Sequence, residues 1–119
     1  MTSPTAPHDL SSVADDILQT ALQSEHGRHA ELLVLDGHLR QSVIALTSGS
    51  RLSEHNAPSA ATIQVLRGAI EVTTDSGSDA RLAQGQLDQL TKERHGVLAL
   101  EDSVFLLTTV TGVEERTQG

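Results

Sequence analysis

The chain has 119 residues, enough for one domain, and its 17 Leu, 9 Val and 4 Ile stand against a single aromatic residue, Phe105. It contains no cysteine, which excludes disulfides, thiolate metal sites and a cysteine nucleophile. The net charge of −8 repels phosphate backbones and anionic lipids, and the absence of Trp and Tyr removes the stacking platforms of single-strand binders, so we expect neither nucleic acid nor a membrane as partner.

Residues 1–8 are predicted to form a flexible tail, because they hold two of the three prolines and no periodic apolar pattern. The tail also lacks the charged and then hydrophobic pattern of a secretory leader. No apolar stretch of the chain approaches the length of a membrane-spanning helix. We therefore expect a cytoplasmic protein.

An N-terminal helix is predicted over residues 9–27. Its apolar residues recur at spacings of three and four, which is typical of a helix with one buried stripe. Asp9, Ser11 or Ser12 can cap its start, and Gly27 is a natural end point. The apolar stripe consists of Leu10, Val13, Ala14, Ile17, Leu18, Ala21 and Leu22.

Residues 28–113 are predicted to form a small β-barrel or jelly roll, followed by a frayed polar end over residues 114–119. Short β-rich runs alternate with turn residues at intervals of roughly ten, the pattern of a sandwich or barrel. The Asp36-Gly37 pair predicts a tight hairpin. The expected strands cover residues 30–35, 39–46, 60–67, 69–74, 80–83, 86–91, 95–100 and 103–111.

The fold class that follows is mainly β with one helix packed on the barrel. A single amphipathic helix cannot bury its stripe alone, so the stripe docks across the chain's own sheet, on another protein or on a partner subunit. Sheet edges favour association, and we expect a homodimer. Asp88 and Gln89 lie inside an expected strand, so one of them faces inward, toward polar groups of the barrel or at a subunit contact.

The six histidines are the most reactive side chains in the sequence. His8 lies in the tail, His26 and His29 flank the expected helix end, and His38 follows the hairpin turn, so each has a structural explanation. The remaining two, His55 and His95, each end a turn segment that leads into a strongly apolar strand. We therefore treat these two as the candidate functional residues.

The segment Gly49-Ser-Arg-Leu-Ser-Glu-His55-Asn-Ala-Pro-Ser-Ala-Ala-Thr-Ile-Gln-Val-Leu-Arg-Gly68 resembles the first motif of the cupin superfamily. That motif has a glycine, five residues, a His-x-His pair, a Glu and a second glycine. The second motif, a glycine, a proline six residues later and a His, is echoed by Gly85, Thr91 and His95. The chain is similar to small single-domain bacterial cupins of unassigned function, which implies a cupin-type β-barrel.

The ligand set that the resemblance implies is incomplete. Metal-dependent cupins hold iron, manganese, nickel, copper or zinc with two His and one Glu from the first motif and one His from the second. In this sequence Ala57 replaces the second His and Ala61 replaces the Glu, which leaves His55 and His95. Because a firm site needs three or four protein ligands, we expect no firmly held cofactor. A weakly bound divalent transition metal at the two histidines is the alternative.

Without a metal, His55 and His95 in an aliphatic barrel mouth can hydrogen-bond a small polar or anionic ligand. Alternatively, they bond the backbone or each other and close the polar end of the barrel. Ile63 and Val65, inward by period-two alternation, complete the predicted ligand-binding set, and no catalytic residue is assigned. The expected function is a cupin-fold small-molecule-binding or sensory module; the alternative is a metal-dependent oxygenase or isomerase with a reduced ligand set.

Overall fold

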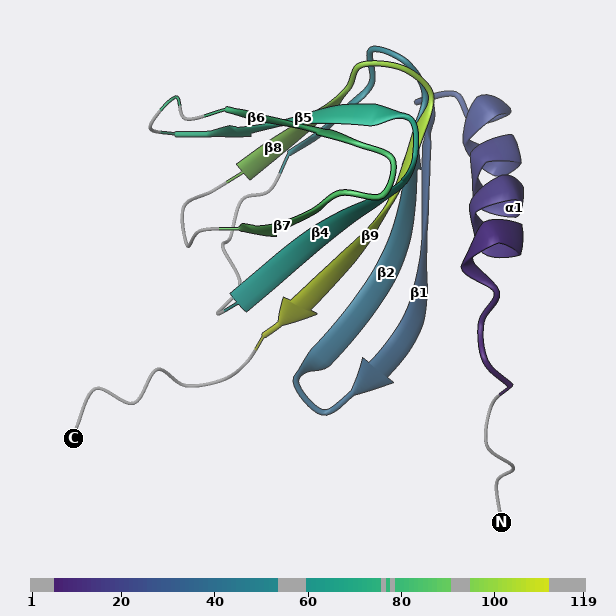
Figure 1. The fold of residues 1–119 in the computed structure, drawn as a ribbon. Coiled ribbons are helices and arrows are strands. Elements are labelled where there is room, and N and C mark those ends of the chain that lie inside the picture. The colour runs from purple at the N-terminus through teal and green to yellow at the C-terminus, as the bar shows by residue number, and fades with distance from the viewer. Residues whose placement is uncertain (1–5, 54–59, 76, 78, 91–94, 112–119) are drawn as a thin grey trace, which may run out of the picture.

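The structure is a computed structural model that describes residues 6–53, 60–75, 77, 79–90 and 95–111. Within these residues the chain forms one helix and two antiparallel β-sheets (Figure 1). The elements are α1 (Leu10–Leu22), β1 (Arg28–Asp36), β2 (Leu39–Leu46), β3 (Arg51–Ser53), β4 (Ala60–Arg67), β5 (Ala69–Thr74), β6 (Ala80–Ala83), β7 (Leu87–Leu90), β8 (His95–Ala99) and β9 (Ser103–Val110).

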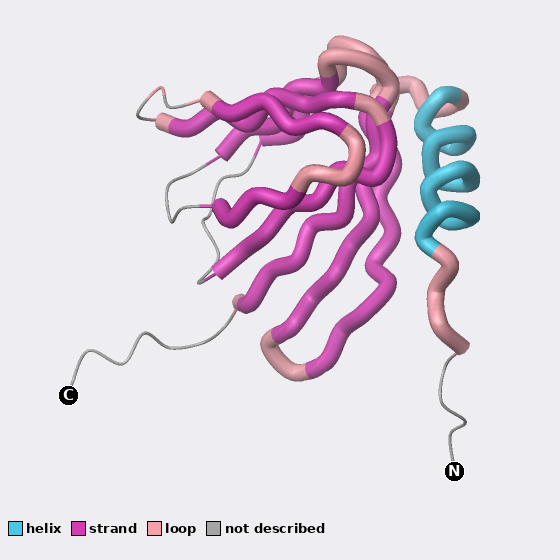
Figure 2. The backbone as a smooth tube through the Cα atoms, in the orientation of Figure 1, coloured by secondary structure: helices cyan, strands magenta, loops and turns pink. Residues whose placement is uncertain are grey.

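The two sheets form the layers of a jelly roll. The larger sheet has five strands in the order β1-β2-β9-β4-β7, and the smaller has four in the order β3-β8-β5-β6. Figure 2 shows the strands as two layers with the single helix outside them. The predicted fold class, mainly β with one helix packed on the barrel, is confirmed.

The inner faces of both sheets supply one aliphatic core. Strand β4 alternates between buried residues at 61, 63 and 65 and less buried residues between them, which is the pattern of a strand with one face on a core. Strand β8 alternates in the same way. The buried members of this interior cluster are Ile44, Leu46, Ile63, Val65, Ile70, Val72, Leu82, Val97, Ala99 and Phe105.

Helix α1 covers the outer face of the five-stranded sheet. Its buried residues Ala14, Ile17 and Ala21 pack against Val43 and other buried residues of β2 and β9. The two alanines lie one helical turn on either side of Ile17, so small side chains let the helix lie close to the sheet. The centre of the apolar stripe is therefore covered by the chain's own sheet, whereas Leu22 at its end is 47% exposed.

The helix begins where the sequence predicts but ends earlier. The Asp9 side chain caps the start by accepting from the Ser11 backbone N–H at 3.1 Å and the Ser12 hydroxyl at 3.2 Å. The helix ends at Leu22, so the expected extension to residue 27 is wrong. No apolar residue continues the stripe beyond Leu22, and the Ser24 hydroxyl accepts from the His26 backbone N–H at 3.2 Å, which favours a turn.

Most strand boundaries agree with the prediction. Four strands, β2, β4, β5 and β6, have the bounds expected from the sequence, and β1 begins two residues earlier, at Arg28. Strand β8 ends at Ala99 and β9 at Val110, each one residue short of expectation. The three-residue strand β3 was not predicted, because Arg51 and Ser53 give it no apolar run. Strand β7 begins at Leu87, one residue later than expected, and residue 91 of the expected strand 86–91 lies outside the described residues.

The two sheets are joined at a tight corner between β4 and β5. Gly68 has a φ of +79°, and a Cβ at this position would meet the Asp102 backbone oxygen and the Ser103 hydroxyl. The buried Ser103 Oγ accepts from the Ala69 N–H at 3.1 Å and donates to the Ala69 oxygen at 2.9 Å or the Glu101 oxygen at 2.7 Å. The motif glycine thus permits a close backbone approach that links β9 to β5.

The ends of the chain are described only in part. Residues 6–9 precede α1 without regular structure, whereas residues 1–5 of the expected tail and the expected frayed end at 114–119 lie outside the described residues. In the described part of the chain, no helix is both long enough and apolar enough to span a membrane.

Candidate ligand site

His95 lies at the start of β8 on the inner face of the four-stranded sheet. It alternates with the buried residues Val97 and Ala99, and its own exposed fraction is 6%. Across the sheet it is opposite Thr74, the last residue of β5. The imidazole therefore belongs to the interior, at the end of the strand where the apolar core begins.

The other predicted histidine, His55, lies outside the described residues, together with Ala57. The two flanking strand residues, Ser53 of β3 and Ala60 of β4, are described and belong to different sheets. The segment that carries His55 thus connects the two sheets. The distance between His55 and His95 falls outside what the structure describes.

Ile63 and Val65, the other predicted ligand-binding residues, are fully buried on the inner face of β4. Val65 is opposite Phe105 of β9, and Ile63 is opposite Leu107. Both side chains belong to the interior aliphatic cluster. Both side chains are therefore part of the core and have no surface exposed to solvent.

Ala61 occupies the inward position at which the cupin motif places a glutamate. The register of the five-stranded sheet puts it opposite Thr109 on one side and Leu90 on the other. Thr109 is in turn opposite Arg40 of β2. Since directly opposed residues share a face, Arg40, Thr109, Ala61 and Leu90 form one inward row across four strands, which we call the Arg40 row.

Asp88 is the inward member of the polar pair in β7. It is opposite Ile63, which is fully buried, whereas Gln89 is opposite Thr62 on the outer face and is exposed. The question that the sequence left open is thereby answered in favour of Asp88. The Asp88 carboxylate thus lies on the inner face of the sheet, two residues before Leu90 of the Arg40 row.

The remaining histidines lie away from the predicted site, although His26 and His29 are not at the helix end as expected, because α1 ends at Leu22. His8 and His26 are exposed. The ring of His29 lies 3.3 Å from the Glu31 carboxylate, and His29 falls within β1 because the helix ends early. The His38 ring donates from Nδ1 to the Thr111 backbone oxygen at 2.8 Å, next to the β1–β2 turn.

The donors in the described part of the chain do not form a firm metal site. Among the described residues, no three His, Asp or Glu side chains lie together in a way that could hold a metal ion. The inward position 61 carries a methyl group, and Gln64 lies out of phase with it on the outer face. Of the two imidazoles that the sequence assigns to the site, the structure describes His95 alone.

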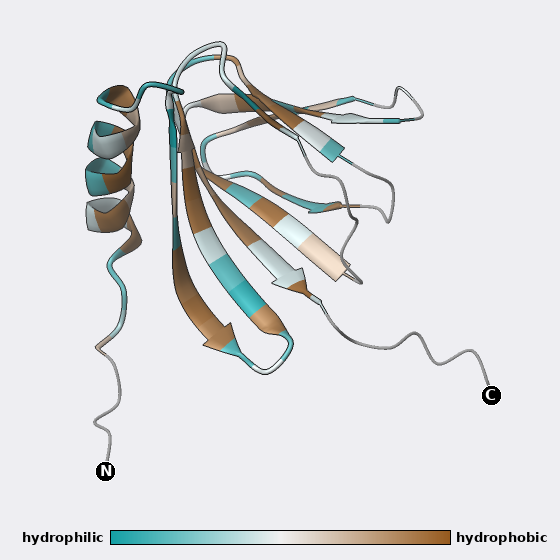
Figure 3. Ribbon diagram, turned by 180° about the vertical axis from the view of Figure 1, so that it is seen from behind, coloured by the Kyte–Doolittle hydropathy of each residue, from teal (hydrophilic) through white to brown (hydrophobic). Residues whose placement is uncertain are grey.

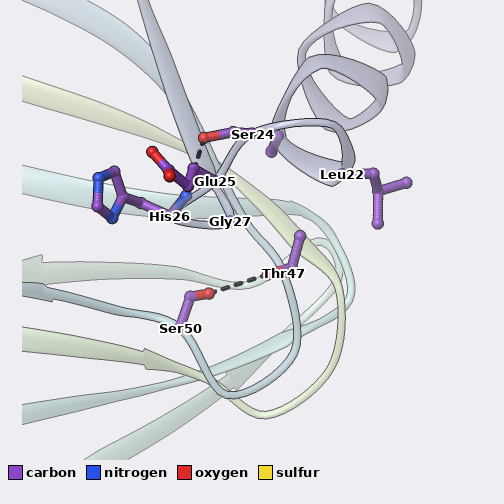
Figure 4. Close-up of a pocket in the computed structure, with 8 residues that line it drawn as sticks. Leu22, Ser24, Glu25, His26, Gly27, Thr47 and Ser50 are labelled. Atoms are coloured by element: carbon purple, nitrogen blue, oxygen red, sulfur yellow. Dashed lines mark hydrogen bonds between the residues drawn. The ribbon is translucent and has the colours of Figure 1, made fainter.

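A separate open groove of about 370 Å³ lies where α1 ends (Figure 4). The hydroxyls of Thr47 and Ser50 are 2.9 Å apart across its floor, and Gly27 provides the space beside them. Sequence reasoning did not identify this groove, because its residues come from a helix end and a strand end that only the fold brings together. It is lined by Ala21, Leu22, Ser24, Glu25, His26, Gly27, Thr47 and Ser50.

Solved structures of other proteins have the same arrangement of strands. A conserved protein of unknown function from Streptococcus pyogenes matches with a TM-score of 0.67 at 26% identity, over 76% of this chain and 80% of its own. The Cupin_2 domain of an XRE family transcriptional regulator from Enterobacter cloacae matches with a TM-score of 0.63 at 17% identity, over 72% of this chain and 98% of that domain.

This protein has the cupin fold. Further matched structures are described as a cupin superfamily protein and an RmlC-like cupin, in agreement with the motif resemblance. Salicylate 1,2-dioxygenase from Pseudoaminobacter salicylatoxidans also matches, with a TM-score of 0.73 at 17% identity. The match covers 87% of this chain but only 34% of the dioxygenase. No family model and no curated protein sequence matches the chain.

Proposed function

We propose that this cupin binds a small polar or anionic molecule in the mouth of its barrel, and that the binding does not depend on a metal. The observation that carries the proposal is the buried, inward imidazole of His95 beside an interior whose usual carboxylate position is Ala61. Such an interior has apolar walls and few polar groups, which is the composition of small-molecule sites.

In this proposal His95 and His55 are the polar contacts, and Ile63 and Val65 form the apolar floor beneath the ligand. A neutral imidazole offers one donor and one acceptor, so a pair of them can bind a hydroxyl, an amide or a carboxylate. The burial of His95 removes competing water, which strengthens each hydrogen bond with the ligand.

The experiment is a ligand titration followed by nuclear magnetic resonance on the full chain. The probes are small carboxylates, amides and polyols at millimolar concentration, and the readouts are the His95 ring signals and the Ala61 backbone amide. We expect at least one class of probe to shift both, and the His95→Ala variant to lose that response. The matched control is His8→Ala, which removes an exposed imidazole far from the barrel. The absence of any shift at these two residues would contradict the proposal.

The competing function is a metal-dependent oxygenase or isomerase, for which the matched dioxygenase is the supporting observation. A metal held by the folded state stabilises it by ~2.7 kcal/mol at a hundredfold excess over its Kd. We expect Mn²⁺, Ni²⁺ and Zn²⁺ to leave the unfolding temperature unchanged within experimental error. If a metal raises the unfolding temperature by several degrees, and the rise is lost in both His55→Ala and His95→Ala, the metal-dependent function is favoured.

We also propose that the protein forms a homodimer through β1. This strand is an edge of the five-stranded sheet, and its hydrophobic stretch includes Leu32 and Leu35, which are 44% and 59% exposed (Figure 3). Exposed apolar edges favour pairing with another strand. Arg28 begins the strand and Asp36 ends it, so a two-fold antiparallel pairing brings opposite charges near each other. Light scattering tests the mass, and we expect Leu35→Lys to give monomers.

A further inference from the structure

We propose that Arg40 and Thr109 bind the anionic group of the ligand, and that the ligand is a small carboxylate with an apolar tail. This inference rests on the proposed binding function and adds the ligand's chemical class and two residues that recognise it. The observation behind it is the Arg40 row, which places a guanidinium, a hydroxyl and the small side chain of Ala61 on adjacent inward positions.

The geometry of the row brings these groups within reach of one ligand. Neighbouring strands are about 4.8 Å apart, so Thr109 is directly beside Arg40, and Ala61 is one strand further along. Thr109 is half-buried and Arg40 is exposed, so the row runs from the rim toward the interior. Opposite Thr109 on β4, residue 61 contributes only a methyl group to the row.

Arg40 has no carboxylate partner among the described residues, a property it shares with Arg28 and Arg51 but not with two other arginines. Arg67 pairs with Asp15 at 3.1 Å, and Arg81 pairs with Glu71 at 3.5 Å. The chain has 16 acidic residues against 8 basic ones, so an arginine without a partner is not explained by a shortage of acids. What distinguishes Arg40 from Arg28 and Arg51 is its position on the inward row beside Thr109 and Ala61, which favours a role in binding an anion from solution.

The guanidinium selects the chemical class of the ligand. Its planar fork of N–H donors matches a carboxylate with two parallel hydrogen bonds, which are stronger than bonds between neutral groups. The Thr109 hydroxyl can donate a further bond to the same group. Leu35, opposite Arg40 on β1, and Leu90, at the other end of the row, provide apolar surface for the remainder of the ligand.

Asp88 gives the ligand an orientation. It lies on β7, three strands away from β2, at a lateral separation of roughly 14 Å from Arg40. At that distance it does not neutralise the guanidinium, since the screening length of physiological salt is about 8 Å. Its negative charge disfavours a second anionic group at the deep end of the site. The expected ligand is therefore a monocarboxylate whose charged end is at the rim.

The test compares hexanoate with hexanamide, which has the same shape and no charge. Binding of each to the full chain is followed through the Ala61 and Thr109 amide signals in the wild type, Arg40→Gln and Arg51→Gln. Arg51 is the matched control, because it is an exposed strand arginine whose loss changes the net charge equally. We expect Arg40→Gln to weaken hexanoate at least about tenfold, to leave hexanamide unchanged, and Arg51→Gln to resemble the wild type.

A second variant distinguishes the loss of a ligand contact from a folding defect in Arg40→Gln. Thr109→Val keeps the shape of the side chain and removes its hydroxyl, and we expect it to weaken hexanoate severalfold. The inference is overturned if hexanoate does not bind, if it binds no better than hexanamide, or if both variants bind it like the wild type. A probe that shifts the His95 signals and binds wild type and Arg40→Gln with equal affinity overturns this inference. The proposed binding function would remain supported by that result. If no probe shifts His95, both proposals fail.

Discussion

Replacing Gly68 with alanine should be among the most damaging single-methyl changes in the chain. Gly68 has a φ of +79°, and an L-residue in this region costs about 1–2 kcal/mol. Its Cβ would also meet the Asp102 backbone oxygen and lie 2.5 Å from the Ser103 hydroxyl. Because backbone cannot move aside cheaply, overpacking adds about 1–3 kcal/mol. The expected loss in the free energy of unfolding is therefore about 2–5 kcal/mol.

Gly85→Ala is the matched control. Gly85 has a φ of +91°, but a Cβ at this position has no neighbour within 4 Å, so this variant bears only the backbone cost of about 1–2 kcal/mol. The difference between the two variants isolates the close approach of β9 to the corner before β5. It should amount to about 1–3 kcal/mol.

Urea unfolding followed by far-ultraviolet circular dichroism measures both variants, and thermal unfolding provides a second reading. Each kcal/mol lowers the unfolding temperature of a domain of this size by roughly 4 °C, so Gly68→Ala should unfold about 8–20 °C below the wild type. Equal losses for Gly68→Ala and Gly85→Ala would refute the reasoning, because the contact with the Ser103 hydroxyl would then add nothing. A change in the urea m-value would indicate an altered denatured state instead.

Three further predictions concern the helix and the Arg40 row. Ile17→Ala should lower the free energy of unfolding by about 2–5 kcal/mol, because Ile17 is buried between α1 and the sheet, whereas the half-exposed Leu22→Ala should cost about 1 kcal/mol or less; equal losses in urea unfolding would contradict this packing. Asp9→Ala should cost about 1 kcal/mol through loss of the helix cap, and Asp9→Asn should retain most of it in the same assay. Ala61→Glu should give Arg40 an internal carboxylate and lower hexanoate affinity as far as Arg40→Gln does; unchanged affinity would argue against the row.

Much of the fold could be predicted because its signals are local. Alternation of apolar residues, turn glycines and the helix stripe each depend on neighbours within a few positions, and they located most strands to within a residue. Two errors share one cause. The sequence pattern extends the helix to Gly27 and does not indicate β3. Polar residues in both places carry no periodic signal, and hydrogen bonds such as that from the His26 N–H to Ser24 Oγ set the conformation after the helix.

The candidate site was less predictable, because it depends on register. Motif spacing identified His95 as inward and Ala61 as the place of a missing ligand, and alternation identified the inward residues of β4. No local pattern indicates that Arg40 is opposite Thr109, sixty-nine residues later, since pairing between distant strands follows from the whole sheet. Asp88 and Gln89 were ambiguous for the same reason, until the pairing of β7 with β4 was known.

The alanine at position 61 and the arginine at position 40, which has no carboxylate partner in the described part of the chain, are two aspects of one arrangement. A glutamate at 61, as the cupin motif implies, would share the inward row with Arg40 and could pair with it across Thr109. With alanine there, the carboxylate is missing both as a metal ligand and as a partner for the guanidinium. The electrostatic preference of that part of the interior then changes sign, from one that favours a cation to one that favours an anion. On this argument, weak metal binding and carboxylate binding are linked consequences of the same residue, so Ala61→Glu should change both together.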